Sequence, residues 1–239
     1  MGQLTTSVAL AKEKALTPVG KGEIIFILDR SGSMGGKESD VIGGFNSAIK
    51  TLRENSNGSP CSVAYWRFDE QIEKVYEVEL TDVPEMTERY YQPRGSTALL
   101  DAVGGAVGDS VNDPDVSYVV ITFTDGYENA SQEWTKDKVS QLIKQRQDLG
   151  NWTFAFFGAD IDAWADAGAM GFSAGNTRGH TSAQTADMMK ATGRVSAMYS
   201  KGKVRSSKHF TDATSAAFDN PDISDDELNR VLEDGENSD

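Results

Sequence analysis

The chain has 239 residues, 38% of them hydrophobic, and its 37 acidic side chains outnumber 23 basic ones to give a formal net charge of -14. This length and apolar content suffice for one domain with a packed core, and the acidic balance argues against nucleic-acid binding. The single cysteine, Cys61, cannot form an intramolecular disulfide and is expected to be a small buried residue, and no apolar run reaches the roughly 18 residues of a membrane span. The sequence therefore predicts a soluble cytoplasmic protein that binds neither nucleic acid nor membrane.

The first predicted strand organises the rest of the chain. It follows residues 1–21, a mixed segment that is expected to be a flexible N-terminal arm, and it is an unbroken apolar run over residues 24–28. Such a run is typical of a strand buried on both faces, in the centre of a parallel sheet. Asp29, Ser31 and Ser33 come directly after it, so oxygen ligands are expected at its carboxyl end. Asp and Ser are also common helix caps, and this stretch alone leaves both interpretations open.

A helix and a pair of strands are predicted next. Apolar residues at helical spacing indicate a helix over residues 40–54 that packs on the sheet. Strands are predicted over 61–68 and 73–80, and the segment 69–72 between them is too short for a parallel crossover. The two strands are therefore expected to form an antiparallel hairpin, which gives the sheet one antiparallel edge strand.

The loop 93–97 is expected to lead into a helix with an apolar face, so that Thr97 stands at the start of that helix. Three glycines weaken this helix, which indicates that they permit a close approach to the sheet. The wholly apolar run 118–123 predicts a second buried strand, and it delivers Asp125 to the carboxyl edge of the sheet. The later predicted elements are a helix over 134–149, a strand over 152–157 and a last helix over 181–199.

The C-terminal part divides into a basic and an acidic segment. Six basic residues and no acidic one lie between residues 190 and 208, whereas residues 219–239 hold nine acidic residues and one arginine. We expect one domain over 22–200, a basic linker over 201–218, and an acidic tail over 219–239 that is largely disordered apart from a short helix around 225–232. The tail keeps the protein soluble, folds back on the basic segment or offers a carboxylate to a neighbouring copy of the chain, and the sequence leaves these alternatives open.

Strands that alternate with amphipathic helices predict a doubly wound α/β domain, with a mostly parallel central sheet, one antiparallel edge strand, helices on both faces and one polar crevice. Three motifs reach this crevice: Asp29-Arg-Ser-Gly-Ser33, Gly95-Ser-Thr97 and Thr124-Asp125-Gly126. In this order and position they resemble the three loops of the metal-ion-dependent adhesion site of von Willebrand factor A-type (VWA) domains. The similarity runs over about residues 23–199 and is greatest to small stand-alone bacterial and bacteriophage members.

The resemblance implies a Rossmann-like VWA fold with a metal site. It implies that Ser31, Ser33 and Thr97 ligate the ion directly, and that Asp29 and Asp125 accept hydrogen bonds from metal-bound water or approach the ion. Hydroxyl and carboxylate oxygens suit Mg²⁺ or Mn²⁺, with Ca²⁺ the weaker candidate. Neutral hydroxyl ligands leave positive charge on the ion and an open coordination position, which an acidic residue of a partner protein can fill. Nearby, Glu128 and Asn129 could line the crevice but are expected to stabilise their loop. Asp160 and Asp162 could rim the site, and Asp162 is equally explained as a helix cap.

The sequence favours a divalent-cation-dependent protein-binding module that is not an enzyme. The alternatives are a structural or assembly protein with a vestigial metal site, and a metal-dependent hydrolase. An aspartyl-phosphate phosphatase needs an acid where Ser31 stands, and a serine hydrolase needs a histidine, whereas His180 and His209 lie in late, polar segments. Residues 32–37 resemble a P-loop but lack its first glycine and the hydroxyl residue after Lys37.

Overall fold

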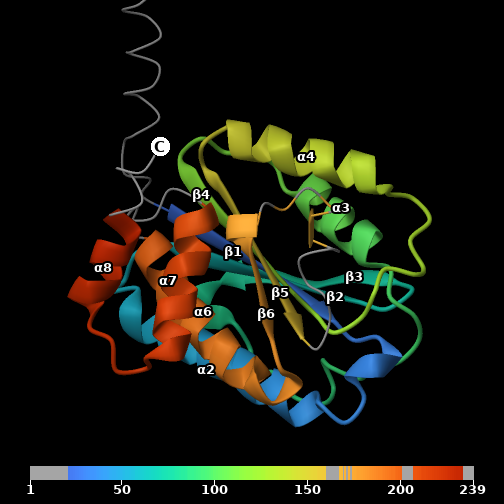
Figure 1. Cartoon of the computed structure of the whole chain (residues 1–239), viewed down its shortest axis with the longest axis horizontal. Helices are drawn as coiled ribbons and strands as arrows, with labels where there is room; N and C mark the ends of the chain where they lie inside the picture. Colours follow the sequence, from blue (N-terminus) through green and yellow to red (C-terminus); the bar gives the residue numbers. More distant parts are fainter. Residues whose placement is uncertain are drawn as a thin grey trace, which may run out of the picture.

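A six-stranded sheet forms the centre of the structure, a computed structural model that describes residues 21–159, 167–168, 170, 172, 174–200 and 207–233 (Figure 1). The strand order is β3-β2-β1-β4-β5-β6, and every neighbouring pair is parallel except β2 with β3. The predicted mixed sheet with one antiparallel edge is therefore confirmed. The strands are β1 (Lys21–Asp29), β2 (Cys61–Phe68), β3 (Ile72–Glu79), β4 (Val116–Thr124), β5 (Trp152–Ala159) and β6 (Thr177–His180).

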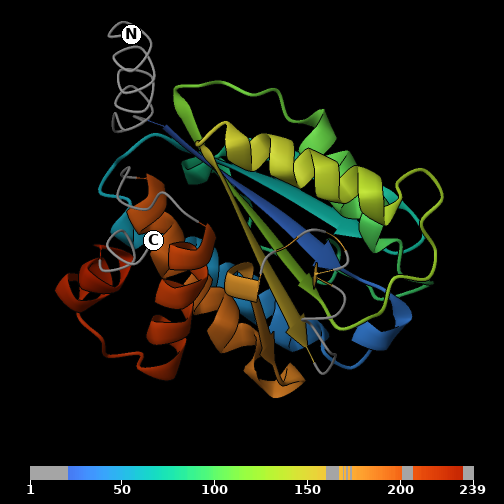
Figure 2. The ribbon, with the colours of Figure 1, turned by 45° about the horizontal axis from the view of Figure 1, so that its top comes forward.

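Helices cover both faces of this sheet (Figures 1 and 2). One face carries α2 (Glu38–Asn55), α6 (Thr185–Ser200) and α7 (Ser207–Asp219), with α8 (Asp225–Glu233) packed on α7. The other face carries α3 (Leu99–Asp109) and α4 (Lys136–Asp148). The fold is thus the predicted doubly wound α/β arrangement.

The apolar run of β1 is explained by the two cores between which it lies. Ile24, Phe26 and Leu28 belong to the core beneath α2, α6 and α7, whereas Ile25 and Ile27 belong to the core beneath α3 and α4. Successive side chains of a strand point to opposite faces, so a strand covered on both sides must be apolar at every position.

One strand was not predicted. β6 consists of Thr177, Arg178, Gly179 and His180, and it pairs in parallel with the end of β5. These residues show neither an apolar run nor a regular alternation, so its sequence carries no strand signal. Residues 160–166, which follow β5, lie outside the described part of the chain.

The predicted division of the C-terminal part is wrong where the structure describes it. Residues expected in a basic linker over 201–218 form most of α7, in which Phe210, Ala213 and Ala217 are buried in the core. The predicted short helix around 225–232 exists as α8, but Leu228 and Leu232 are buried, so this part of the tail is packed. Residues 1–20, 201–206 and 234–239, including most of the expected arm, lie outside the described residues.

The start of the acidic segment folds back on one residue of the basic one. The guanidinium group of Arg194 donates to Asp225 Oδ1 and to the backbone oxygen of Ile223, each at 2.6 Å. An ion pair also joins Arg178 to Asp219, at 2.8 Å. Both contacts place acidic residues of the tail against basic residues of the domain.

Two further features bear on the sequence predictions: the burial of Cys61 and the character of the helices. Cys61 is buried as predicted, and burial raises the pKa of its thiol to about 12, which keeps it protonated and unreactive. In the described part of the chain, no helix has both the length and the apolar character that a membrane span requires.

The glycines of α3 make room for a tryptophan rather than for the sheet. A Cβ atom at Gly104 would lie 2.1 Å from the Trp134 ring and one at Gly108 would lie 3.4 Å from it, whereas Gly105 has no such neighbour within 4 Å. The expected approach to the sheet is therefore wrong, because these glycines lie on the side of α3 that faces the segment before α4.

Glycine instead brings helices α2 and α6 into backbone contact. A Cβ atom at Gly193 of α6 would lie 2.4 Å from the backbone oxygen of Ala48 in α2. We expect Gly193→Ala to lower the free energy of unfolding by about 2 kcal/mol, because the added methyl group overpacks this crossing. Gly43→Ala in α2 is the matched control: no atom lies within 4 Å of its Cβ position, and the change should stabilise the helix by about 1 kcal/mol. Urea denaturation of the two variants should give opposite signs, and two stabilised proteins would refute the close contact.

A half-buried carboxylate on β1, Glu23, should make stability depend on pH. Burial, reinforced by the charge of Glu77, raises the pKa of Glu23 from 4.5 to about 7. Between these values the folded state binds a proton that the unfolded chain has released, so stability falls as the pH rises through this range. After allowance for solvent screening, Glu23→Gln should add about 1 kcal/mol to the free energy of unfolding at pH 8 and little at pH 4.5. Urea unfolding at both pH values checks this, and an equal effect at the two would contradict it.

Candidate metal centre

The candidate residues meet at the carboxyl ends of β1 and β4, the strands at the centre of the sheet. The chain passes from β1 to β2 on one side and later to β4 on the other, so the order of strands reverses between β1 and β4. In open α/β sheets, ligands bind outside the carboxyl ends of the strands at such a switch point. Asp29 ends β1 and Thr124 ends β4, and both are buried.

Hydrogen bonds join four of the five predicted site residues. Asp29 Oδ1 accepts from the backbone N–H of Ser31 at 2.6 Å, and the Ser31 and Ser33 hydroxyl oxygens lie 3.1 Å apart. The Ser33 hydroxyl donates to Asp125 Oδ1 at 2.6 Å. The second carboxylate oxygen of Asp29 accepts from the Thr124 hydroxyl at 2.5 Å. The network therefore links the first and third motifs across the crevice.

The fifth residue, Thr97, is located by its neighbour Gly126. A Cβ atom at Gly126 would lie 2.8 Å from Thr97 Oγ1 and 3.4 Å from Asp29 Oδ2, so all three groups border one small space. The loop that presents Thr97 turns at Gly95, whose φ of 66° favours glycine, and a Cβ atom there would collide with the Glu70 carboxylate. The structure thus brings all five predicted residues close together at the carboxyl ends of β1 and β4.

Glu128 and Asn129, which follow the third motif, hold the loops together, as predicted. Asn129 Oδ1 accepts from the backbone N–H of Thr97 at 2.9 Å. The Glu128 carboxylate accepts from the backbone N–H groups of Leu100, at 2.8 Å, and Ala130, at 3.0 Å. These bonds tie the loop after β4 to the start of α3. Asp160 and Asp162, expected at the rim, lie outside the described residues.

Asp69, a buried carboxylate in the connection between β2 and β3, anchors the loop that precedes Thr97. Asp69 is 0% exposed, and its carboxylate accepts from Arg94 Nε at 2.7 Å and from the Gln71 backbone N–H, also at 2.7 Å. Arg30 Nε lies 3.1 Å from the same carboxylate, and the Arg30 side chain is 5% exposed. The backbone oxygen of Asp69 accepts from the Ala98 N–H at 2.8 Å. Burial lowers the pKa of Arg30, and the Asp69 charge opposes this effect.

Sequence reasoning assigned no site role to three groups that contact the site, although its third motif includes Thr124. Thr124 donates to Asp29, Tyr91 donates from its hydroxyl to the Asp29 backbone oxygen at 2.5 Å, and the Lys37 ammonium group contacts Asp125 Oδ2. Thr124 could have been found from its place beside Asp125 at a strand end. No spacing rule connects Lys37 or Tyr91 with these carboxylates.

The chemistry of this donor set fits a hard divalent cation. Its members supply two carboxylates and three hydroxyl groups, all oxygen ligands. Burial raises the pKa of Asp29 to about 6, against hydrogen bonds from Thr124 and Ser31, and the nearby Asp125 charge raises it further. A bound cation would offset this cost of burying a carboxylate. Among the described residues, no cluster of three His, Cys, Asp or Glu side chains could hold a metal, so a site here depends on the hydroxyl groups.

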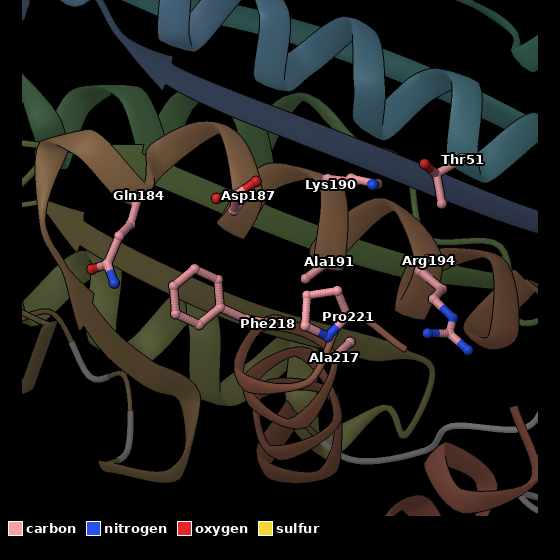
Figure 3. Close-up of a pocket in the computed structure, with 9 residues that line it drawn as sticks. All are labelled: Thr51, Gln184, Asp187, Lys190, Ala191, Arg194, Ala217, Phe218 and Pro221. Atoms are coloured by element: carbon pink, nitrogen blue, oxygen red, sulfur yellow. The ribbon is translucent and has the colours of Figure 1, made fainter. Parts of the chain in front are cut away.

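Two cavities are relevant to ligands. One, of about 450 Å³, is lined by Glu38, Ser39, Glu88, Tyr91, Gln92 and Pro93. Another, of about 250 Å³, lies on the outer side of α6, between that helix and the end of α7, and none of the five site residues lines it (Figure 3). The first cavity is likewise lined by none of these five residues, and its link to them is Tyr91, which donates to the Asp29 backbone oxygen.

Comparison of the sequence with protein-family models and with curated proteins finds no match. Solved structures, by contrast, define the class of fold. The ArnB paralog VWA2 from Sulfolobus acidocaldarius is 16% identical, with a TM-score of 0.55 over 74% of this chain and 46% of its own. The vWF domain of the type V pili tip protein Mfa5 from Porphyromonas gingivalis is 10% identical, with a TM-score of 0.57 over 77% of this chain and 97% of its own. The pilus adhesin SpaC from Lactobacillus rhamnosus GG is 12% identical, with a TM-score of 0.60 over 78% of this chain and 32% of its own.

These likenesses extend over about three quarters of the chain at low identity, so they concern its architecture. The chain has the fold of VWA domains, as the sequence motifs implied. It covers less than half the length of the VWA2 and SpaC chains that it matches.

Proposed function

We propose that this chain is a divalent-cation-dependent protein-binding module that recognises an acidic residue of a protein partner. The observation that carries the proposal is the convergence of Asp29, Ser31, Ser33, Thr97 and Asp125, from three separate loops, at the switch point of the sheet. None of these five polar residues belongs to either apolar core. The similarity of fold to a pilus adhesin and a pili tip protein supports a role in binding rather than in catalysis.

The residues of the crevice divide between ligation and charge balance. The hydroxyl oxygens of Ser31, Ser33 and Thr97 would hold Mg²⁺ or Mn²⁺, and the carboxylates of Asp29 and Asp125 would balance its charge and orient its water ligands. The bound ion supplies a concentrated positive charge with an open coordination position. A carboxylate of the partner would fill that position, which makes the interaction dependent on the metal. We place this activity in the cytoplasm and assign no enzymatic reaction to it.

The first test of the proposal is a comparison of thermal melting in EDTA with melting in millimolar Mg²⁺ or Mn²⁺. If the ion binds only the folded state, saturation at about 100 times Kd should stabilise by roughly 2.7 kcal/mol, a shift of several degrees at this size. Identical melting curves in all three conditions would refute metal binding.

Removal of one hydroxyl ligand should weaken metal binding without unfolding the domain. Thr97→Ala takes away the hydroxyl group but keeps the backbone N–H that donates to Asn129, so we expect at least a tenfold loss of Mn²⁺ affinity and a native circular dichroism spectrum. Ser31→Ala and Asp125→Ala should behave alike, and Thr51→Ala on α2 is a control without an effect on affinity. Calorimetric titration with Mn²⁺ measures the difference. Aggregation of all three site variants would instead identify these residues as structural caps.

The partner can be sought by affinity capture from the native host with and without EDTA. A protein retained by the wild type in Mg²⁺, and lost both in EDTA and with Asp125→Ala, would support the proposal. A partner retained equally in EDTA would favour the alternative of an assembly protein with a vestigial metal site. Turnover in a hydrolase panel with Mn²⁺ that is abolished by Asp29→Ala would favour an enzyme.

A further inference from the structure

Lys37 places a positive charge inside the candidate metal centre. Its ammonium group contacts Asp125 Oδ2, whose side chain is 1% exposed, while the Lys37 side chain is 24% exposed. The other oxygen of the same carboxylate accepts from the Ser33 hydroxyl. Both oxygens of Asp125 are therefore occupied by groups of the chain itself.

The charge at the centre differs with and without this lysine. Asp29 and Asp125 carry two negative charges when ionised, and Lys37 cancels one of them. A divalent cation that entered beside the bound ammonium group would be repelled by it, and this repulsion is stronger in a buried crevice than in water. The ammonium group and the metal ion thus compete for the same buried carboxylate.

We propose that Lys37 is a built-in competitor of the metal: its ammonium group neutralises Asp125 in the metal-free protein and leaves as the divalent cation binds. The inference rests on the metal site of the proposed function and goes beyond it, because it assigns the setting of the metal affinity to one residue. The competitor also keeps the crevice folded without metal, since it offsets the repulsion between Asp29 and Asp125.

The surroundings of Lys37 allow it to leave. It follows Gly35 and Gly36, and Gly36 has a φ of 85° with no neighbour within 4 Å of its Cβ position. A cavity of about 450 Å³ is lined by Glu38, the residue after Lys37, and by Tyr91, which also donates to the Asp29 backbone oxygen. A long and flexible side chain can therefore move out of the crevice without disturbing α2.

The test is calorimetric titration of the full chain with Mn²⁺ and with Mg²⁺. Lys37→Met should bind both ions at least tenfold more tightly than the wild type, whereas Lys37→Arg, which keeps the charge, should not bind more tightly. Lys37→Gln serves as a second neutral variant should the first fail to fold. Lys50→Met removes the same charge from an exposed position on α2 and should change the affinity less than twofold, because solvent and salt screen it.

Each outcome decides between the proposals. Equal affinities of the wild type and both neutral variants would refute competition by Lys37 and leave the metal site in place. If Lys50→Met gained as much affinity as Lys37→Met, net charge alone would explain the gain and competition by Lys37 would be refuted. No binding by any of the proteins would overturn both proposals. Binding by the neutral variants alone would support the competitor and overturn metal dependence of the wild type. In a metal-binding wild type, amine-reactive labelling of Lys37 should rise on addition of Mg²⁺, and unchanged labelling would refute its release.

Discussion

Replacement of Asp69 by alanine should lower the free energy of unfolding by about 3–5 kcal/mol. The buried guanidinium group of Arg30 would lose the carboxylate at 3.1 Å, and the remaining acid near it, Glu73, lies at 3.7 Å and is half exposed. Removal of one partner of a buried ion pair leaves a charge without compensation, and this is more costly than the pair itself is stabilising. The Gln71 backbone N–H would also lose its acceptor. Urea denaturation measures the difference.

The matched control removes the other arginine from the same carboxylate. Arg94 also pairs with Asp69, but its side chain is 55% exposed, so Arg94→Ala should have a much smaller effect. Asp69→Asn should fall between these two variants, because it keeps an acceptor for Gln71 but not the charge. If Asp69→Ala proved as stable as Arg94→Ala, the carboxylate would not be essential to the fold. Because Asp69 anchors the loop before Thr97, we also expect Asp69→Asn to weaken Mn²⁺ binding.

Replacement of Phe210 by alanine should cost about 3–5 kcal/mol, the range for loss of a fully buried aromatic side chain. Phe210 is fully buried and packs edge-to-face on Tyr199 of α6, with ring centroids 6.3 Å apart. The helix that carries it is also fixed to the sheet, since Ser207 Oγ accepts from the backbone N–H of Phe154 at 3.0 Å. The prediction therefore tests whether α7 belongs to the domain rather than to a linker.

A second phenylalanine of α7 provides the control for this prediction. Phe218 is partly exposed, and the Arg178 guanidinium group lies over its ring at 5.1 Å. Phe218→Ala removes the same number of atoms from the same helix but less buried area, so it should cost less than half as much as Phe210→Ala. A loss for Phe210→Ala as small as that expected for Phe218→Ala, in thermal or urea unfolding, would contradict the place of α7 in the core.

The sequence by itself determined the central strands and which oxygen-bearing side chains follow them. The apolar run 24–28 predicted a central strand because each face of a doubly covered strand meets a core, and Asp29, Ser31 and Asp125 followed from the ends of two such runs. The short connection 69–72 fixed the antiparallel edge, since a chain of that length cannot cross back over the sheet. In each case the signal is local, carried by neighbouring residues or by a fixed period.

The tertiary structure alone decided which charges meet and where the domain ends. Lys37 and Asp125 are 88 residues apart, and Arg94 and Asp69 are 25 apart, so no period along the chain could pair them. The basic residues before α7 suggested a linker. The buried side of α7 gave little warning against this, because it consists of one phenylalanine and small residues such as Ala213. The composition of such a helix is dominated by its exposed side chains. The few buried side chains that hold it in place become evident only when another element covers them.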